Sequence, residues 1–372
     1  MIISALKSTN HTDTRSPIHI DTIKTLIDLE IEVWFEEGVG SGINVNDSAF
    51  EDIGLKKHSR NDCLKNANLL LTNESLSSEE LELVKSGSTI LGMVNPFNNN
   101  AFIKSCSDKN INLVSMEFIP RITRAQKMDV LSSQANLAGY VAVIESAKHL
   151  STALPMMMTA AGTLKPAKVF VIGVGVAGLQ AIATAKRLGA RVEAFDTRDV
   201  VEEQVNSLGA KFVKIDLGET GETDQGYAKE LSEEQINKQK ELQSNVCARS
   251  DIVITTAQLF GRPAPLLVDN QTIDKMAPGS VIFDMAVESG GNVEGSAIDE
   301  IVERNGVKII GISNIASKVS NHASLALSNN YNNWIADFYD VELSNIKFDF
   351  EDEIIKSSVL VFEGKITNER FQ

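Results

Sequence analysis

A glycine-rich turn gives the clearest chemical signal in the sequence. Its glycines follow the pattern Gly173-Val-Gly175-Val-Ala-Gly178, directly after an apolar run and directly before an alanine-rich stretch. Gly173 permits a tight turn, Gly175 leaves room for a pyrophosphate, and Gly178 lets a helix pack closely against a strand. The free N–H groups at the start of that helix attract phosphate. The turn residues expected at the phosphates of a dinucleotide are Gly173, Gly175, Val176, Ala177 and Gly178.

A carboxylate follows at the distance that a dinucleotide site requires. The next apolar run, Arg191–Asp196, ends in an aspartate that is placed to accept hydrogen bonds from the adenosine ribose. Its negative charge repels a 2′-phosphate, so we predict binding of NAD(H) rather than NADP(H). The positive charge of Arg198 opposes this preference. The alternative interpretation of the whole motif is a structural turn with a capping aspartate. The residues expected at the ribose are Asp196, Thr197 and Arg198.

A second polar constellation lies in the segment PRITRAQKMDVLSS. Its polar members are Arg121, Gln126, Asp129 and Ser132. Local chemistry alone favours a structural interpretation, in which Asp129 caps the helix that follows and Arg121 pairs with it. The functional alternative is that these groups hold the ribose and the carboxamide of a nicotinamide.

Alternating strand and helix patterns place both motifs in parallel α/β domains. In the first third of the chain, strands are expected at Ile2–Leu6, Glu32–Phe35, Asn68–Thr72, Thr89–Val94 and Asn112–Met116. Helices between them are expected at Asp21–Leu29, Glu79–Lys85 and Phe102–Lys109. A long helical pattern over Asp129–Leu150 then connects to a second domain.

The middle of the chain has the six strands that a doubly wound dinucleotide-binding fold requires. They are expected at Lys168–Gly173, Arg191–Asp196, Lys211–Asp216, Ile252–Ala257, Val281–Ala286 and Lys308–Ile312. Helices are expected at Gly178–Leu188, Val201–Leu208 and Tyr227–Ala248, the last of them after an exposed loop at Leu217–Gly226. We therefore predict an α/β protein with two Rossmann-like doubly wound domains and a cofactor cleft between them. The expected domains are residues 1–135, completed by 320–372, and residues 136–319.

Composition excludes several classes of function. The formal net charge of −15 argues against binding to nucleic acid or to an anionic membrane surface. No apolar run reaches the roughly 18 residues of a membrane-spanning helix, and the polar N-terminus does not suit a signal peptide. The scattered cysteines fit reduced thiols in the cytoplasm. We expect no metal site, histidines at surfaces or helix ends, and Met156, Met157 and Met158 packed in a core or between domains.

Longer segments of the chain resemble a known family. These segments are MEFIPRITRAQKMDVLSSQANLAGY, MMMTAAGTLKPAKVFVIGVGVAGLQAIATAKRLGA, ITTAQLFGRPAPLLV and DMAVESGGN. They are similar to the NAD(H)-binding component of proton-translocating nicotinamide nucleotide transhydrogenases, most densely between Met116 and Gly311. Gly226-Tyr227-Ala228 matches the mobile loop of that family, whereas Ala316 stands where the family has a proline.

This resemblance implies a division of labour between subunits. It implies that NAD(H) binds here and NADP(H) binds a separate partner subunit, with direct hydride transfer coupled to proton translocation by a membrane subunit. It also implies a homodimer at the cytoplasmic face of the inner membrane. The residues implied to position the nicotinamide, without acting as acid or base, are Arg121, Gln126, Asp129, Ser132 and Tyr227. The further cofactor contacts that it implies are Gln258, Leu259 and Glu288.

Alanine dehydrogenase is similar in its cofactor motifs and is the nearest alternative. That enzyme binds its oxoacid with an arginine and a lysine and uses a histidine as acid/base. Arg15 matches the arginine, but the lysine and histidine positions fall on Thr72 and Val94. Without a proton donor, amination of an oxoacid has no mechanism. A second alternative is a non-enzymatic NAD(H)-sensing module, which Gln126 and Tyr227 argue against because sensing needs no loop aimed at a second nucleotide.

Overall fold

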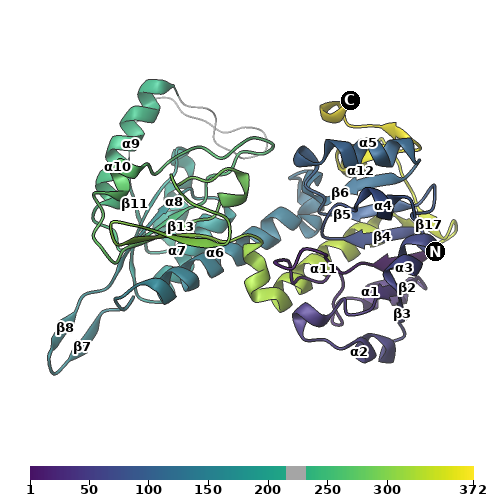
Figure 1. Cartoon of the computed structure of the whole chain (residues 1–372), viewed down its shortest axis with the longest axis horizontal. Helices are drawn as coiled ribbons and strands as arrows, with labels where there is room; N and C mark the ends of the chain where they lie inside the picture. The colour runs from purple at the N-terminus through teal and green to yellow at the C-terminus, as the bar shows by residue number, and fades with distance from the viewer. Residues whose placement is uncertain (215–231) are drawn as a thin grey trace. The chain divides into compact units, whose positions relative to one another are not determined.

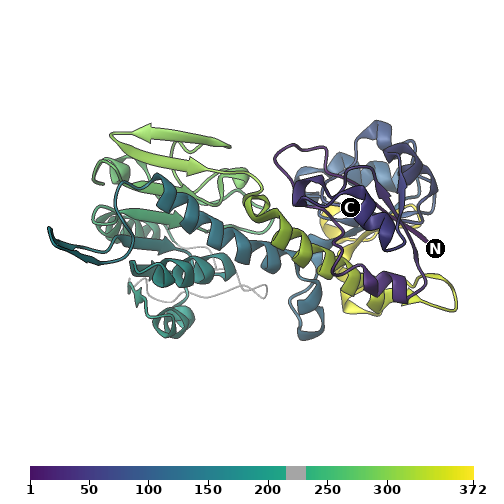
Figure 2. The ribbon, with the colours of Figure 1, turned by 90° about the horizontal axis from the view of Figure 1, so that it is seen from below.

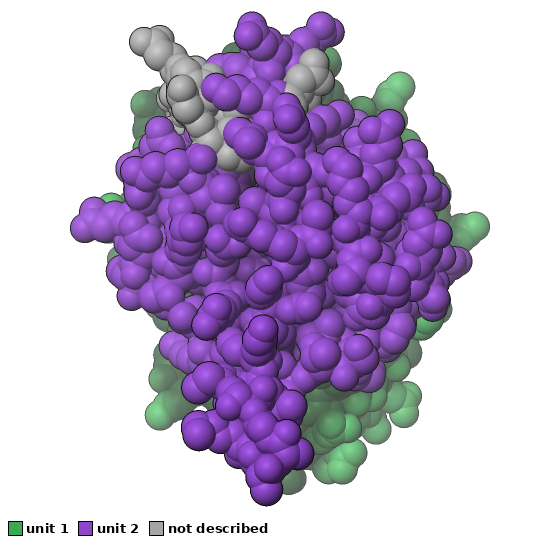
Figure 3. Space-filling model, turned by 90° about the vertical axis from the view of Figure 1, so that its left-hand side faces the viewer, with its two compact units in different colours: residues 1–134, 317–372 green, residues 135–316 purple. Residues whose placement is uncertain are grey.

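The computed structural model describes residues 1–214 and 232–372. The chain divides into two compact units, which are coloured separately in Figure 3 and labelled by element in Figure 1. Unit 1 comprises residues 1–134 and 317–372, and unit 2 comprises residues 135–316. Unit 1 is therefore assembled from two stretches that lie far apart in the sequence, whereas unit 2 is one continuous stretch.

Unit 1 is organised around an eight-stranded sheet with the order β19-β18-β6-β5-β4-β1-β2-β3. Strands β1 to β6 are parallel and have the doubly wound order 3-2-1-4-5-6. The C-terminal segment adds an antiparallel hairpin beside β6. The strands are β1 (Ile2–Ala5), β2 (Glu32–Glu36), β3 (Lys56–His58), β4 (Leu69–Thr72), β5 (Thr89–Gly92), β6 (Asn112–Ser115), β18 (Val359–Phe362) and β19 (Lys365–Ile366).

The longest helix that lies wholly in unit 1 comes from the C-terminal segment. This helix, α11 (Ser320–Phe338), contributes the fully buried Tyr331 and Trp334 to the core of the unit. Three of the shorter helices, α3, α4 and α12, begin at a capping side chain, and at α4 Ser77 and Glu80 form a reciprocal capping box. The other α-helices are α1 (Lys24–Asp28), α2 (Asp47–Asp52), α3 (Arg60–Asn66), α4 (Ser78–Leu81), α5 (Asn100–Asp108) and α12 (Glu353–Ser358). The short 3-10 helices include η3 (Met116–Phe118), η4 (Thr123–Met128) and η8 (Glu369–Phe371).

Unit 2 has a seven-stranded sheet with the order β11-β10-β9-β12-β13-β15-β14. All neighbours are parallel except β14 and β15, so the doubly wound order recurs here with one antiparallel edge strand. The strands are β9 (Lys168–Ile172), β10 (Arg191–Phe195), β11 (Lys211–Phe212), β12 (Ile252–Thr255), β13 (Val281–Asp284), β14 (Glu300–Arg304) and β15 (Val307–Gly311). The helices are α6 (Val130–His149), which begins in unit 1, α7 (Val176–Arg187), α8 (Glu202–Ser207), α9 (Glu233–Cys247) and α10 (Asn270–Ile273).

These two sheets confirm the predicted fold class of two Rossmann-like doubly wound α/β domains. Strands β3 and β14 have no counterpart among the predicted elements, because both are edge strands with charged sequences and no apolar run. The predicted strand Lys211–Asp216 is observed only as Lys211–Phe212, and its last two residues lie outside the described part of the chain. The predicted loop Leu217–Gly226 also lies outside it.

The predicted burial of the methionine run is wrong. Strands β7 (Met157–Thr159) and β8 (Gly162–Leu164) form a hairpin that projects from the sheet of unit 2 (Figures 1 and 2). Met156 and Met158 are 60% and 82% exposed. Gly162 has a φ of 122°, a conformation that favours glycine and lets the chain reverse. The methionines therefore lie on a turn-forming hairpin instead of in a core.

His19 does not lie at the surface, which is one of the two locations predicted for the histidines. Its side chain is buried, and its Nδ1 accepts a hydrogen bond from the backbone N–H of Asp21 at 3.2 Å. Burial lowers the pKa of the imidazole, and the nearby Asp21 carboxylate offsets only part of this effect. His19 is therefore neutral in the folded protein at neutral pH.

The cysteines are free and buried at Cys63, Cys106 and Cys247. Burial raises the pKa of each thiol to about 12, so little reactive thiolate forms at neutral pH. Within residues 1–214 and 232–372, no cluster of carboxylate, imidazole and thiol groups has the makings of a metal site. In the same ranges, none of the helices combines the length and the apolar character that crossing a bilayer requires.

We predict that His19 makes unit 1 sensitive to acid. Its folded-state pKa lies below the value of 6.5 for an exposed imidazole, so unfolding takes up a proton below that pH. The stability contribution is complete above pH 6.5 and is lost as the pH falls towards the folded-state pKa. Between about pH 7.5 and about pH 5.5, the midpoint of urea unfolding should therefore fall less in His19→Gln than in the wild type. Equal falls in the two proteins would contradict this assignment.

Candidate functional site

The glycine turn of unit 2 lies where β9 ends, beside β12. In the strand order, this is the point from which the two halves of the sheet run in opposite directions, and doubly wound sheets bind ligands there. Gly173 has a φ of 97°, which favours glycine. A Cβ on Gly178 would lie 2.0 Å from the carbonyl oxygen of Gly173. Helix α7 therefore packs against the turn only because both positions are glycine.

The middle glycine fits a different requirement. Gly175 is exposed and is the N-cap residue of α7. A Cβ on Gly175 would meet no other described atom within 4 Å, so internal packing of the described residues does not demand a glycine there. Val176 and Ala177 follow in the first turn of α7, whose N–H groups lack partners within the helix. Open space above a helix N-terminus fits a dinucleotide pyrophosphate.

Asp196 is held immediately after β10 by the turn and by a neighbouring arginine. Its Oδ2 accepts the backbone N–H of Val174 at 2.7 Å, which ties the carboxylate to the glycine turn. The Arg198 guanidinium donates to both carboxylate oxygens at 2.9 Å, and the Arg198 backbone N–H adds a further bond at 2.9 Å. Thr197, between them, is partly buried. A ribose that binds Asp196 therefore competes with the guanidinium for the carboxylate.

The remaining predicted cofactor residues follow strands β12 and β13 of unit 2. Gln258 is exposed, and its Nε2 donates to the carbonyl of Met285 at 3.2 Å. Leu259 follows it and is partly buried. Glu288 is exposed, and its carboxylate accepts the backbone N–H of Asn314 at 3.1 Å. These three residues lie in the loops after β12 and β13, at the same edge of the sheet as the glycine turn.

Sequence reasoning missed two residues that shape these loops. Asp284 is fully buried at the end of β13, and its carboxylate accepts backbone N–H groups from the loop that follows and the hydroxyl of Ser296 at 2.7 Å. The Asn292 amide donates to the carbonyls of Ala257 and Pro265 at 2.9 and 2.8 Å. Both residues belong to the segment DMAVESGGN. Its polar residues directly after an apolar run are the signal in the sequence that could have indicated them.

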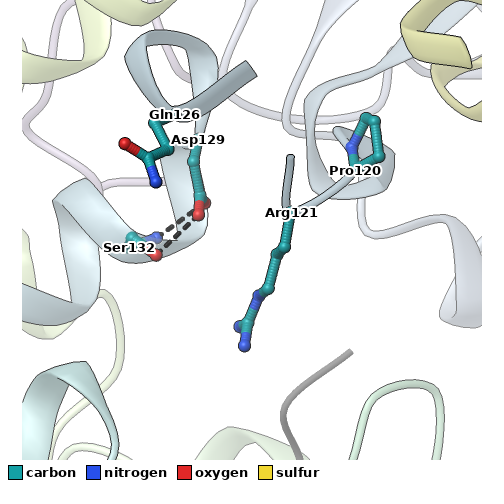
Figure 4. A pocket seen from close by; sticks show the side chains of 5 residues that line it. All are labelled: Pro120, Arg121, Gln126, Asp129 and Ser132. Carbon is teal, nitrogen blue, oxygen red and sulfur yellow. Dashed lines mark hydrogen bonds between the residues drawn. The ribbon is translucent and has the colours of Figure 1, made fainter. Parts of the chain in front are cut away.

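The second constellation assembles within unit 1. Pro120, Arg121, Gln126, Asp129 and Ser132 line one hollow, which we call the polar hollow. In Figure 4 the side chains of Gln126, Asp129 and Ser132 lie on one wall of it, and that of Arg121 extends into it from the other side. Gln126 and Arg121 are exposed, whereas Asp129 and Ser132 are partly buried. The structure thus brings together all four residues that the sequence singles out in this segment.

Asp129 also has the structural role that local chemistry favours. It precedes α6, and its Oδ1 accepts the backbone N–H of Ser132 at 2.9 Å, as an N-cap residue does. Its Oδ2 accepts the Ser132 hydroxyl at 2.6 Å (Figure 4). The cap thereby fixes the Ser132 side chain at the wall of the polar hollow, so the structural and the functional interpretations are compatible.

The two groups of candidate residues belong to different units. The polar hollow lies in unit 1, and the glycine turn with its neighbours lies in unit 2. Tyr227, the remaining predicted positioning residue, lies outside the described residues.

Comparison with known proteins decides the family. Residues 6–138 match the N-terminal domain, and residues 142–369 the C-terminal domain, of the family described as alanine dehydrogenase/PNT. The chain belongs to this family. Together the two matches cover both units, including the polar hollow and the glycine turn.

Individual relatives point to the transhydrogenase branch of the family. The chain is 43% identical to the first part of the NAD(P) transhydrogenase alpha subunit of Rickettsia prowazekii, over 99% of this chain and 96% of that protein. It is 41% identical to the protein of the same name from Rhodospirillum rubrum, over 99% and 98%. A crystal structure of transhydrogenase from Sinorhizobium meliloti shares 40% identity, covers 98% of this chain and 100% of that one, and superposes with a TM-score of 0.88. These similarities confirm the resemblance inferred from the sequence motifs.

We predict opposite effects of Asp196 and Arg198 on the choice of cofactor. Asp196→Ala removes the predicted acceptor for the ribose, so NADH affinity should fall about 10- to 100-fold, the value of a hydrogen bond to a charged group. The preference for NADH over NADPH should narrow at the same time. Arg198→Ala leaves the carboxylate charge without its counter-ion, so that preference should widen.

Titration calorimetry with NADH and NADPH gives the affinity ratio for each variant. The two variants serve as controls for each other, because both break the same ion pair. A shift of the ratio in the same direction in both would contradict the assignment of Asp196 as the discriminating group.

Proposed function

We propose that this chain is the NAD(H)-binding component of a proton-translocating transhydrogenase. The observation that carries the proposal is the polar hollow, because it gathers hydrogen-bonding side chains suited to a nicotinamide and its ribose. The glycine turn and Asp196 support it with a fit to the rest of a dinucleotide. In this proposal NADP(H) binds a separate partner subunit, and hydride passes directly between the two nucleotides. The proposed positioning residues are Arg121, Gln126, Asp129, Ser132 and Tyr227.

The proposed mechanism assigns this chain binding and orientation rather than acid/base work. When bound here, NADH would supply a hydride, and transfer of that hydride to a second nicotinamide would need no proton from this chain. The chain accelerates such a step by fixing the donor and limiting water. Gln126 offers an amide donor and an acceptor at the exposed end of the polar hollow, and Asp129 immobilises the Ser132 hydroxyl. The glycine turn contributes its N–H groups to the phosphates, and Gln258, Leu259 and Glu288 are proposed as further contacts.

Proton translocation belongs to other subunits in this proposal. The names of the relatives describe them as the first portion of an alpha subunit, which supports a complex of several chains. The net charge of −15 suits docking on a basic protein surface rather than on anionic lipid. We accordingly place the chain at the cytoplasmic face of the inner membrane, attached through its partner subunits.

The geometry around Arg15 favours this proposal over alanine dehydrogenase. Arg15 is the residue that matches the oxoacid-binding arginine, and here it forms a buried ion pair with Asp13 at 2.6 Å. Its guanidinium also donates to Gln134 at 3.1 Å. The aligned lysine and histidine positions hold Thr72 and Val94, both buried. An oxoacid carboxylate would have to displace Asp13 from a buried pair, which is costly.

Glu117, an acid close to Val94, is likewise held by internal hydrogen bonds. Burial raises the pKa of Glu117. Its Oε1 accepts the backbone N–H of Asn95 at 2.7 Å, and its Oε2 accepts the Ser115 hydroxyl at 2.7 Å. These bonds give Glu117 a structural role at the end of β6.

We predict that Gln126→Ala slows hydride transfer about 100-fold, the order of loss expected when a reacting group is misplaced. The assay uses NADH on this chain and the thionicotinamide analogue of NADP⁺ on the NADP(H)-binding component of a related transhydrogenase. Thr123→Ala, an exposed change on the same 3-10 helix outside the polar hollow, should transfer hydride at the wild-type rate.

Three results, from this assay or from NADH oxidation and NADH binding measured without transfer, would refute the proposal. Transfer at the wild-type rate by Gln126→Ala would remove the polar hollow from the mechanism. NADH oxidation with pyruvate and ammonia in the absence of the partner would establish an amino-acid dehydrogenase. NADH binding without transfer to any partner component would establish an NAD(H)-sensing module.

We also propose that the chain forms a homodimer through the β7–β8 hairpin. Met156, Met157, Met158 and Leu164 expose apolar surface there, and an isolated two-stranded hairpin is marginally stable in water. A second copy of this chain would cover both faces of the hairpin. The resemblance to a dimeric family supports this choice of partner.

We predict that Met158→Asp converts the dimer to a monomer, because a charge in an apolar interface cannot be solvated. Ile298→Asp is the matched control, since Ile298 is an exposed apolar residue of the same unit outside the hairpin. Sedimentation velocity over a range of concentrations distinguishes the two species. A dimer that persists in Met158→Asp, or one that dissociates equally in both variants, would contradict the assignment.

A further inference from the structure

The polar hollow is carried by a 3-10 helix whose opposite face packs on α11. In η4, Ala125 and Met128 are fully buried, whereas Gln126 is exposed. Residues three apart lie above one another on a 3-10 helix, so the two buried residues form one face. They join the cluster that contains Tyr331 and Trp334 of α11. Apolar packing holds this face of η4 against α11, and hydrogen bonds can add directional restraints to it.

A single buried amide supplies such bonds at two places. Asn330 of α11 is 6% exposed. Its Nδ2 donates to the carbonyl of Lys127 at 2.9 Å, and its Oδ1 accepts the hydroxyl of Ser133 at 2.7 Å. A backbone carbonyl can only accept, so the orientation of the amide is fixed by its partners. Residues 127 and 133 flank the part of the polar hollow that holds Asp129 and Ser132, so Asn330 joins the two ends of this segment.

Other contacts to η4 are weaker restraints. The Asn333 amide reaches the same Lys127 carbonyl at 3.2 Å from a more exposed position. The side chains of Lys127 and Arg124 form ion pairs with Asp337 and Asp352, but about half of each basic side chain is exposed. Exposed ion pairs contribute little to stability, whereas an unsatisfied buried group is costly. Asn330 is therefore the dominant polar restraint among these contacts.

We propose that Asn330 is a positioning residue that fixes the geometry of Gln126, Asp129 and Ser132 in the polar hollow. That the polar hollow binds a nicotinamide rests on the proposed function. That Asn330 restrains the segment does not rest on it. Asn330 acts on the segment through Lys127 and Ser133 and lies in unit 1. The glycine turn and Asp196, the candidates for binding the phosphates and the adenosine ribose, lie in unit 2 and keep their own contacts. Loss of Asn330 should therefore lower the rate of hydride transfer by much more than it lowers NADH affinity.

The test combines a structural readout with a kinetic one on the full chain. Hydrogen exchange, followed by mass spectrometry, reports the freedom of residues 121–133. Single-turnover transfer from NADH to the thionicotinamide analogue of NADP⁺ on a related NADP(H)-binding component reports the chemistry. Calorimetry gives the NADH dissociation constant. In Asn330→Ala we expect faster exchange in this segment, transfer slowed about 10- to 100-fold, and a dissociation constant within about 2-fold of the wild type.

Two further variants make the result specific. Asn332→Ala is the matched control: Asn332 is also buried on α11, at 2% exposed, but its amide donates to the carbonyl of Thr22 at 2.9 Å, away from η4. It should lower the melting temperature and leave exchange of residues 121–133 and transfer unchanged. Ser133→Ala removes one of the two bonds from a partly buried position, so it should fold and show the same effects as Asn330→Ala at smaller size.

The outcomes separate this inference from the proposed function. Unaltered exchange of residues 121–133 in both Asn330→Ala and Ser133→Ala would overturn it. Equal effects of Asn332→Ala on exchange and transfer would overturn it as well, since they would reveal general destabilisation. A wild-type protein that transfers no hydride would refute the proposed function, while faster exchange in the Asn330 and Ser133 variants would still establish the restraint.

Discussion

Parallel strand pairing is the constraint on which both units depend. It requires a crossover between neighbouring strands and brings their carboxyl ends to one edge of the sheet, together with the N-termini of the following helices. In unit 2 this edge collects the glycine turn, Asp196 and Gln258 from three different strands. The hydrogen bond from the Val174 N–H to Asp196 links two of these loops directly. Candidate residues that are scattered along the sequence thus become neighbours without any special long-range contact.

The polar hollow is built on a different principle. It lies between the end of the parallel sheet and the start of α6, in a segment that is mostly 3-10 helix and loop. The hydrogen bonds of a 3-10 helix have poorer geometry than those of an α-helix, so the shape of this segment depends on what packs behind it. Asp129 stabilises the C-terminal end of this segment by capping α6. On the face turned away from the hollow, Ala125 and Met128 of η4 pack in the core cluster that contains residues of α11. The apolar packing of η4 thus depends on residues other than those that face the hollow.

The fold class and the local features of this protein could be predicted from the sequence, whereas individual long-range side-chain contacts could not. The glycine turn and the carboxylate after β10 are separated by one strand–helix–strand unit, so spacing alone predicts them. The cap at Asp129 is equally local. Asn330 stands 203 residues from its carbonyl partner, and no pattern in SNNYNNW distinguishes it from its neighbouring asparagines. The prediction that the methionines are buried is wrong, and the sequence does not predict that His19 is buried, for a related reason. Topology decides which residues are buried, and side-chain type is only a weak guide to it.

The discontinuity of unit 1 has a consequence for how the protein is made. Ribosomes deliver the chain from its N-terminus, and domains fold as their sequences emerge. Unit 2 is a continuous stretch that ends at Ala316, so all of it is available before the return segment of unit 1 exists. Until Ser320–Phe338 emerges, the nascent first unit exposes the apolar face that α11 later covers. The segment that carries Gln126 is synthesised well before α11, and it cannot acquire its final packing until α11 emerges. The apolar face exposed in the meantime is of the kind that chaperones bind.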